Sequence, residues 1–139
     1  WHDKIMFDVK QTNELVMPTG RTYKYQPEVN SQGNLKYPRT RILNYPVQGL
    51  GADLMTIARV SLYNKIVNIE GVKLINTVHD SIMLDFDEKI CYTNSIVPIV
   101  KESFENVPAN FKHLFGKDFN LPVRVDIQVG NSWGNVEDV

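Results

Sequence analysis

The chain has 139 residues, of which 42% are apolar, and a formal net charge of −1, which suits at most one packed domain and argues against a disordered chain. Its single cysteine, Cys91, excludes an internal disulfide and a cysteine-based zinc site, and no apolar run approaches the roughly 20 residues that span a bilayer. The chain opens Trp-His-Asp-Lys, without an initiator Met or a signal peptide, so we expect a processed, trimmed or split product in the cytoplasm and no membrane partner.

The charges are unevenly spread along the chain. Residues 21–41 hold five basic side chains and one acid, Glu28, whereas residues 80–88 hold four acids and no basic side chain. A positive and a negative segment in one domain fit a site where phosphates meet metal cations. Ordinary surface charge would give the same distribution, so the charges alone leave both interpretations open.

The first elements that the sequence predicts are strands. Residues 14–27 contain two short apolar and aromatic runs around a Pro18-Thr19-Gly20 turn, which is typical of two strands joined by a tight connection. Residues 30–38 follow as a polar loop.

A long helix is predicted next. Apolar residues recur at i, i+3 and i+4 spacing, and proline suits the first turn of a helix but not its interior, so we expect the helix to run from near Pro46 to about Val67. Gly49 and Gly51 lie in its first turns, where each glycine weakens a helix by about 1 kcal/mol. Close approach by another backbone or by a ligand could compensate. The expected apolar positions are Val47, Leu50, Leu54, Ile57, Ala58 and Leu62.

The second half of the chain is predicted to begin with a hairpin. Two apolar, β-branched runs at residues 72–78 and 81–86 flank His79-Asp80, a pair of residues suited to a two-residue turn between antiparallel strands.

Two further helices and a strand should follow this hairpin. We expect a helix with an N-cap at Asn94 or Ser95, a short helix closed by Gly116, and a half-buried strand at residues 123–129, where apolar and polar residues alternate. Tight turns make neighbouring strands antiparallel. The predicted fold class is therefore α+β, an antiparallel sheet with helices packed on one face, formed by residues 1–139 as a single partial domain.

The His79-Asp80 pair has two interpretations. It can be a plain turn, because His and Asp are among the non-glycine residues that tolerate positive φ, or it can project a carboxylate from a rigid hairpin toward a hard divalent cation. A second pair, His2-Asp3, suggests a His/Asp metal phosphohydrolase. That class places its ligands on helices, however, whereas these pairs lie between strands and at the chain terminus, so we disfavour it.

A second candidate group lies at the head of the long helix. Asn44 and Gln48 can be a cap and an exposed helix residue, or their amide donors can test base-pair shape in a minor groove, where every base pair offers acceptors. Arg39 and Arg41 would suit phosphate oxygens. Asp53 is expected to make an internal pair or cap rather than a metal bond.

Together these segments resemble the C-terminal part of the palm of family A DNA polymerases. "TVHDSIMLD" (residues 77–85) is similar to the family's motif C, and "NYPVQGLGADLM" (residues 44–55) to its N-x-P-x-Q-G-x-x-A-D element. "TGRTYKY" (residues 19–25) resembles the preceding hairpin and "DIQVGNSW" (residues 126–133) the closing strand. The four segments occur in family order over nearly the whole chain, and the C-terminal region has a phage-like character.

The resemblance implies a catalytic role for the hairpin. Asp80 would be a ligand of catalytic Mg²⁺ ions and His79 would lie near the primer terminus, in a DNA-directed DNA polymerase that joins deoxynucleoside triphosphates to primer-template DNA by two-metal nucleotidyl transfer. Ser81 departs from the family, which often has Glu at this position, so a supporting carboxylate is missing.

The resemblance also implies DNA-binding residues. Gln48 and Asn44 would contact the minor groove at the newest base pairs, and Arg41 and Arg39 would be backbone or template contacts. The family commonly has Arg four residues before the Asn, whereas this chain has Thr40 between two arginines, which weakens the assignment of the arginine role.

Important parts of the family are absent from this sequence. No segment matches motif A, which carries the second metal-holding aspartate, and the fingers, thumb and exonuclease have no counterpart here. We therefore expect a palm subunit or fragment that is inactive alone and needs a partner chain carrying the fingers and motif A. The alternatives are a non-catalytic DNA-binding module and an assembly protein derived from a polymerase palm.

Overall fold

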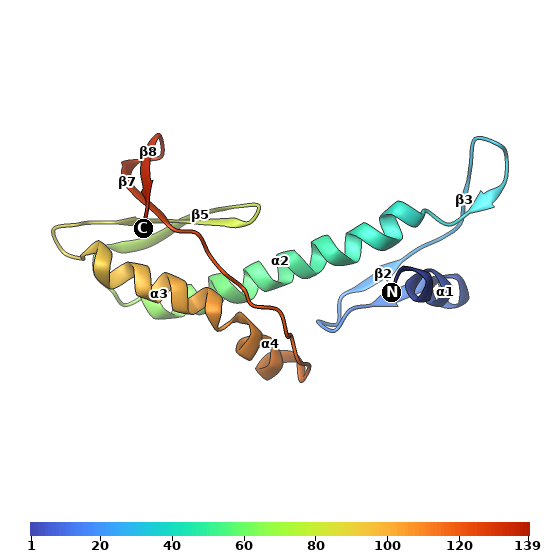
Figure 1. Ribbon diagram of the computed structural model, residues 1–139, viewed down its shortest axis with the longest axis horizontal. Helices are drawn as coiled ribbons and strands as arrows, with labels where there is room; N and C mark the ends of the chain where they lie inside the picture. The colour runs from blue at the N-terminus through green and yellow to red at the C-terminus, as the bar shows by residue number, and fades with distance from the viewer. The chain divides into compact units, whose positions relative to one another are not determined.

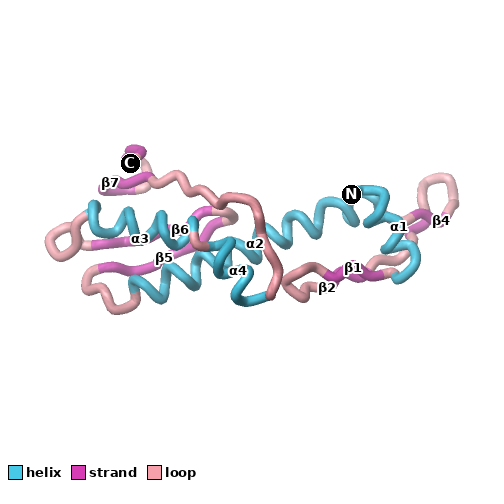
Figure 2. Tube along the Cα trace, turned by 60° about the horizontal axis from the view of Figure 1, so that its bottom comes forward, coloured by secondary structure: helices cyan, strands magenta, loops and turns pink.

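The computed structural model describes residues 1–139, whose helices and strands are shown in Figures 1 and 2. The chain forms two compact units, residues 1–53 and residues 54–139. The long helix α2 (Arg39–Ile66) contributes its first part to one unit and its second part to the other.

The first unit begins with a helix that was not predicted from the sequence. Its elements are α1 (His2–Thr12), β1 (Glu14–Val16), β2 (Thr22–Lys24), β3 (Glu28–Val29), β4 (Leu35–Lys36) and the first part of α2. Met6 and Val9 of α1 are buried against Tyr25 and Ile42. Their spacing on one helical face, with Asp3 in the first turn, is the signal that could have predicted this helix.

The strands of the first unit agree in part with prediction. β1 and β2 pair antiparallel, with Leu15 opposite Tyr23, and Gly20 takes a φ of 83° in the turn between them, which confirms the expected pair of strands. The loop expected at residues 30–38 is wrong in detail, because β3 and β4 form a second antiparallel pair around a turn in which Asn30 Oδ1 accepts two backbone N–H groups.

Helix α2 starts seven residues earlier than expected, at Arg39 instead of Pro46. Pro46 lies in the helix interior, where it cannot donate a hydrogen bond to the Ile42 carbonyl. The side chains of Ile42 and Pro46 are nonetheless fully buried, and this packing offsets the lost bond. Val47, expected on the apolar face, is 57% exposed, because the buried side of the first turns is set by Ile42 and Pro46.

In the second unit, helices pack on one face of a hairpin. This local arrangement agrees with the predicted packing of helices on one face of a sheet. Its elements are the second part of α2, β5 (Val72–Val78), β6 (Ser81–Phe86), α3 (Thr93–Glu105), α4 (Val107–Phe115), β7 (Gln128–Ser132) and β8 (Asn135–Asp138). Leu62 and Ile66 of α2 and Ile96 of α3 form a buried cluster with Val72 and Cys91. Figure 2 shows β5 and β6 beside these helices.

The expected single antiparallel sheet is wrong. The structure has four separate two-stranded antiparallel sheets, β1–β2, β3–β4, β5–β6 and β7–β8. Each strand pairs only with its neighbour in sequence, so the class is mixed α and β, built from local hairpins. None of the helices is both long and apolar enough to cross a membrane.

The ends of the last elements differ from prediction in two places. Helix α3 begins at Thr93 after Tyr92, with no side-chain cap from Asn94 or Ser95. The strand expected at residues 123–129 is assigned as a strand only from Gln128, where its ladder begins, although its burial alternates as predicted. The expected closure of α4 is confirmed, because Gly116 takes a φ of 65° and donates its N–H to the Lys112 carbonyl.

Candidate functional site

The His79-Asp80 turn lies at the tip of the β5–β6 hairpin. Val78 pairs with Ser81, which leaves two residues in the turn, and His79 adopts a φ of 51°. The Ser81 hydroxyl donates to the Val78 carbonyl at 2.8 Å and closes the turn. Both His79 and Asp80 are exposed, so the turn presents an imidazole and a carboxylate to solvent.

The base of this hairpin is held by the core of the second unit. Leu74, Leu84 and Phe86 pack against the buried cluster that contains Leu62 and Ile66 of α2. A register shift between Leu74 and Asn76 interrupts the ladder before the tip. A packed base with an exposed tip is a suitable support for a functional carboxylate, because the scaffold limits the motion of the turn.

The other acids of residues 80–88 do not join Asp80 at the tip. Asp85 lies opposite Lys73 in the ladder, and Asp87 accepts the Lys89 backbone N–H at 2.9 Å. The structure contains no group of three or more His, Cys, Asp or Glu side chains that could hold a metal ion. Asp80 is thus the single carboxylate that the tip offers to a cation, which fits a site needing one or two protein carboxylates plus phosphate oxygens.

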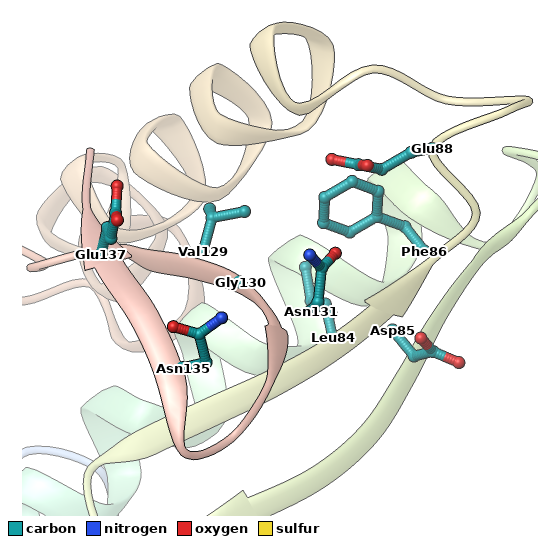
Figure 3. Close-up of a pocket in the computed structure, with 9 residues that line it drawn as sticks. All are labelled: Leu84, Asp85, Phe86, Glu88, Val129, Gly130, Asn131, Asn135 and Glu137. Carbon is teal, nitrogen blue, oxygen red and sulfur yellow. The ribbon is translucent and has the colours of Figure 1, made fainter.

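A pocket in the second unit lies elsewhere. Figure 3 shows it between β6 and the β7–β8 hairpin, where Leu84 and Phe86 face Val129 and Asn131. The three acids that also line it, Asp85, Glu88 and Glu137, have no basic side chain among them. Its lining includes neither His79 nor Asp80, so this pocket is separate from the exposed turn.

In the first unit, α2 brings some of the predicted DNA-binding residues to one face. Each residue of a helix advances about 100° around its axis, so Asn44 and Arg41 lie within about 40° of Gln48. Asn44 and Gln48 are exposed. Arg39, the first residue of the helix, lies about 180° around the axis from Gln48 and therefore on the opposite side.

The two arginines also differ in their partners. The Arg41 guanidinium forms an ion pair with Glu28 of β3 at 2.6 Å, and each of the two side chains is just over half exposed. Arg39 is exposed and has no ion pair. The arginine on the Gln48 face is therefore neutralised in the free chain, and the unpaired arginine faces another way.

Asp53 makes the internal pair that the sequence predicted. Arg21 Nη2 donates to Asp53 Oδ1 at 2.5 Å, and Thr19 Oγ1 donates to Asp53 Oδ2 at 2.8 Å. The Arg21 hydrogen bond holds the pKa of the Asp53 carboxyl below its ordinary value despite partial burial. The partners, Arg21 and Thr19, were not predicted; the only available signal was a cation in the β1–β2 turn.

The remaining His-Asp pair does not contribute to a metal site. His2 and Asp3 lie in the first turn of α1, where both are exposed. The ring of His2 packs against Trp1, with ring centroids 5.2 Å apart. A lone pair of this kind at a helix start has no further ligand around it.

The family model and the similar proteins found by comparison agree on one family. The family model described as DNA polymerase family A matches residues 1–135. The chain is 26% identical over 135 residues to a DNA polymerase I of Aquifex aeolicus and 30% identical over 117 residues to one of Borreliella burgdorferi, which cover 96% and 81% of this chain. A thermostable DNA polymerase I of Thermus filiformis is 33% identical over 65% of the chain. The matched region spans 20%, 12% and 9% of these three relatives.

Proposed function

This chain belongs to DNA polymerase family A, and we propose that it forms the C-terminal part of the palm of a DNA-directed DNA polymerase. The observation that carries the proposal is the exposed Asp80 at the tip of a packed hairpin, inside a match that covers residues 1–135. The same hairpin follows a helix that presents Asn44 and Gln48 on an open face. In this proposal the chain is part of the replication machinery of a cell or, given its phage-like C-terminal region, of a phage acting in its host's cytoplasm.

The proposed roles follow from the chemistry of each side chain. Asp80 would hold a divalent cation, Mg²⁺ by preference, through its carboxylate oxygens. When bound, such a cation supplies charge stabilisation at the reacting phosphate and activation of the primer 3′-hydroxyl. His79, next to Asp80, would position the primer terminus, and Asn44 and Gln48 would donate to minor-groove acceptors without reading sequence.

The arginines have unequal support as DNA contacts. Arg41 shares the Gln48 side of α2, so it can reach the same duplex once DNA phosphates replace Glu28 as its partner. Arg39 lies on the other side of the helix and would contact the backbone of a different segment, such as the template strand. We therefore propose Arg41 as the stronger of the two contacts.

The proposal also requires a second polypeptide segment. One carboxylate holds a cation weakly, and a two-metal site needs the other aspartate, which we assign to a partner chain that carries motif A and the fingers. Two features of the hairpin support such a partner. The β5–β6 sheet has only two strands, so each keeps an unpaired edge, and Ile75 and Val78 of β5 are 60% and 39% exposed.

The test is Asp80→Ala in the polymerase reconstituted from this chain and its partner. We expect primer extension to fall by about 10²-fold or more, because a group that stabilises transition-state charge contributes on that scale, while primer-template binding persists. Asp85→Ala is the matched control, since Asp85 lies opposite Lys73 away from the tip, and it should extend primers normally.

The alternative function is a non-catalytic DNA-binding or assembly module. The single carboxylate at the tip is the observation in its favour. Extension that survives Asp80→Ala would support this alternative and contradict a catalytic role. Robust extension by the isolated, monodisperse chain would contradict the requirement for a partner, and an absence of salt-dependent DNA binding would leave only the assembly role.

A further inference from the structure

Three side chains join the β1–β2 hairpin to helix α2. Thr19 and Arg21 flank the tip of the hairpin, and Asp53 lies on the helix. Arg21 Nη2 and Nε donate to the two oxygens of Asp53 at 2.5 and 3.3 Å, and Thr19 Oγ1 donates to Oδ2 at 2.8 Å. We call this set, Thr19, Arg21 and Asp53, the hairpin clamp. A bidentate guanidinium–carboxylate pair fixes orientation as well as distance.

The clamp is more protected than the other ion pair of the hairpin. The side chains of Arg21 and Asp53 are 47% and 16% exposed, whereas those of Lys24 and Glu14, 3.4 Å apart, are 79% and 45% exposed. The pKa of the Asp53 carboxyl is lowered chiefly by the Arg21 hydrogen bond and also by that of Thr19. Asp53 therefore stays ionised at neutral pH and keeps both donors.

A glycine lets the hairpin lie directly on the helix next to the clamp. A Cβ added at Gly49 would collide with the Tyr23 hydroxyl and would lie 3.3 Å from Arg21 Cδ. Gly49 is one helical turn before Asp53, so both residues contact the same hairpin. The sequence suggested that another backbone or a ligand would approach a glycine of this helix; at Gly49 the approaching groups are instead side chains, those of Tyr23 and Arg21.

The clamp holds the side of α2 that faces away from Gln48. With about 100° per residue, Gly49 and Asp53 lie about 100° and 140° around the helix from Gln48. The buried residues Ile42 and Pro46 lie in the same sector, at about 120° and 160°. The hairpin and core therefore hold one side of the helix, and Gln48 stays exposed on the other.

We propose that Arg21 and Asp53 are positioning residues, whose clamp fixes the helix so that Gln48 and Asn44 are presented to the minor groove of the primer terminus. This inference rests on the proposed polymerase function, because it assigns Gln48 a contact with DNA. Neither Arg21 nor Asp53 needs to touch DNA. Their effect on activity passes through Gln48, and that dependence separates positioning from a purely structural contribution.

The first measurement needs only this chain. Hydrogen exchange of the β1–β2 amides and of α2 around Gly49 should become faster in Arg21→Met and in Asp53→Asn, because the hairpin is released from the helix. Lys24→Met, which removes a cation from an exposed pair on the same hairpin, is the control and should exchange as wild type. Unchanged exchange in both clamp variants would overturn the proposal.

The second measurement is primer extension by the reconstituted polymerase. Arg21→Met should lower kcat for extension by roughly 10- to 100-fold, since a misplacement of about 1 Å can cost about 10²-fold. The reversed pair Arg21→Asp with Asp53→Arg should restore much of it. In a Gln48→Ala background Arg21→Met should cost little more, because the residue that it positions is gone.

The outcomes separate this inference from the proposed function. Losses that add fully with Gln48→Ala, or a Gln48→Ala variant as active as wild type, would overturn positioning even if Asp80→Ala strongly lowers extension as expected. Extension that survives Asp80→Ala would overturn the proposed function instead. The hydrogen-exchange result on the clamp does not depend on either activity.

Discussion

At the scale of single residues, the backbone of His79 is the observation that most favours a functional turn. Only Asn13 and His79 among the non-glycine residues have positive φ, at 59° and 51°. Asn13 closes α1 by donating its N–H to the Val9 carbonyl, which is a common position for Asn. His79 closes no helix, and glycine would take its conformation at lower cost. An imidazole kept there at a cost in stability fits a role for the side chain.

Replacing His79 should separate this cost from the function. His79→Gly should raise the free energy of unfolding by about 0.5–1 kcal/mol, because glycine relieves the left-handed strain but loses more chain entropy on folding. His79→Ala keeps the strain and should give no such gain. We expect both variants to reduce primer extension by the reconstituted polymerase. Chemical denaturation checks the stabilities, and a His79→Gly variant no more stable than His79→Ala would contradict the strain argument.

The ionisation of Asp53 gives a prediction about pH. Its pKa is lowered in the folded chain, chiefly by the Arg21 hydrogen bond, so its stabilising contribution is present above the unfolded pKa of about 3.9 and is lost as the pH falls through the folded pKa. Wild type should be more stable than Asp53→Asn by a constant amount between about pH 5 and 8. That difference should shrink below about pH 4.

Denaturant unfolding of both proteins at a series of pH values measures this difference. A stability gap that stays unchanged into strongly acidic solution would mean that the Asp53 charge does not contribute. Equal stability of wild type and Asp53→Asn at pH 7 would also contradict the prediction, because the ion pair is then complete in the wild type.

At the scale of elements, local patterns predicted hairpins and helix interiors well. The β5–β6 hairpin was predicted because its pairing, its turn and its buried face all lie within 15 neighbouring residues, Val72–Val78 through Ser81–Phe86. The start of α2 was not, because the rule against interior proline was overridden by burial of Pro46 and Ile42. Ile42 packs against Met6 and Val9 of α1, a distant segment of the chain, so its burial cannot be seen in the local pattern.

Pairings between distant segments could not be predicted either, because they depend on tertiary contacts that a local pattern does not contain. The alternation at residues 123–129 predicted the faces, since Val123, Val125 and Ile127 are partly buried, but not that the ladder begins only at Gln128. At the candidate site, sequence motifs singled out Asp80 and Gln48, which the structure shows to be exposed and whose roles stay predictions; an internal partner for Asp53 was expected. That the partner is Arg21, 32 residues away, was set by tertiary packing.

The two glycines of α2 should respond oppositely to substitution. Nothing lies within 4 Å of a Cβ placed at Gly51, so Gly51→Ala should raise the free energy of unfolding by about 1 kcal/mol through helix propensity. At Gly49 the new methyl group meets Tyr23, so Gly49→Ala should lower it by about 1–3 kcal/mol. Adding Tyr23→Phe removes the closest atom and should recover part of that loss; no recovery would contradict the contact as the cause.

At the scale of the whole molecule, the chain exposes surface that a self-contained enzyme would cover. All four sheets have only two strands, a size that depends on packing against other elements for its stability. Ile75 and Val78 are exposed on β5 beside the Asp80 turn. This exposed surface supports our proposal that a partner chain packs against the hairpin.

A charge at Ile75 should test whether this surface is an interface. Ile75 is 60% exposed, so Ile75→Lys should change the free energy of unfolding of the isolated chain by no more than about 0.5 kcal/mol. If the partner covers this side of β5, burying an unpaired lysine should weaken assembly by about tenfold or more, equivalent to about 1.4 kcal/mol.

Leu114→Lys on α4 is the control, because Leu114 is also 60% exposed but lies on a different element. Titration of the partner against each variant, followed by primer extension, measures the effect. Wild-type assembly by Ile75→Lys, or equal weakening by Leu114→Lys, would show that the β5 surface is not the specific site of contact.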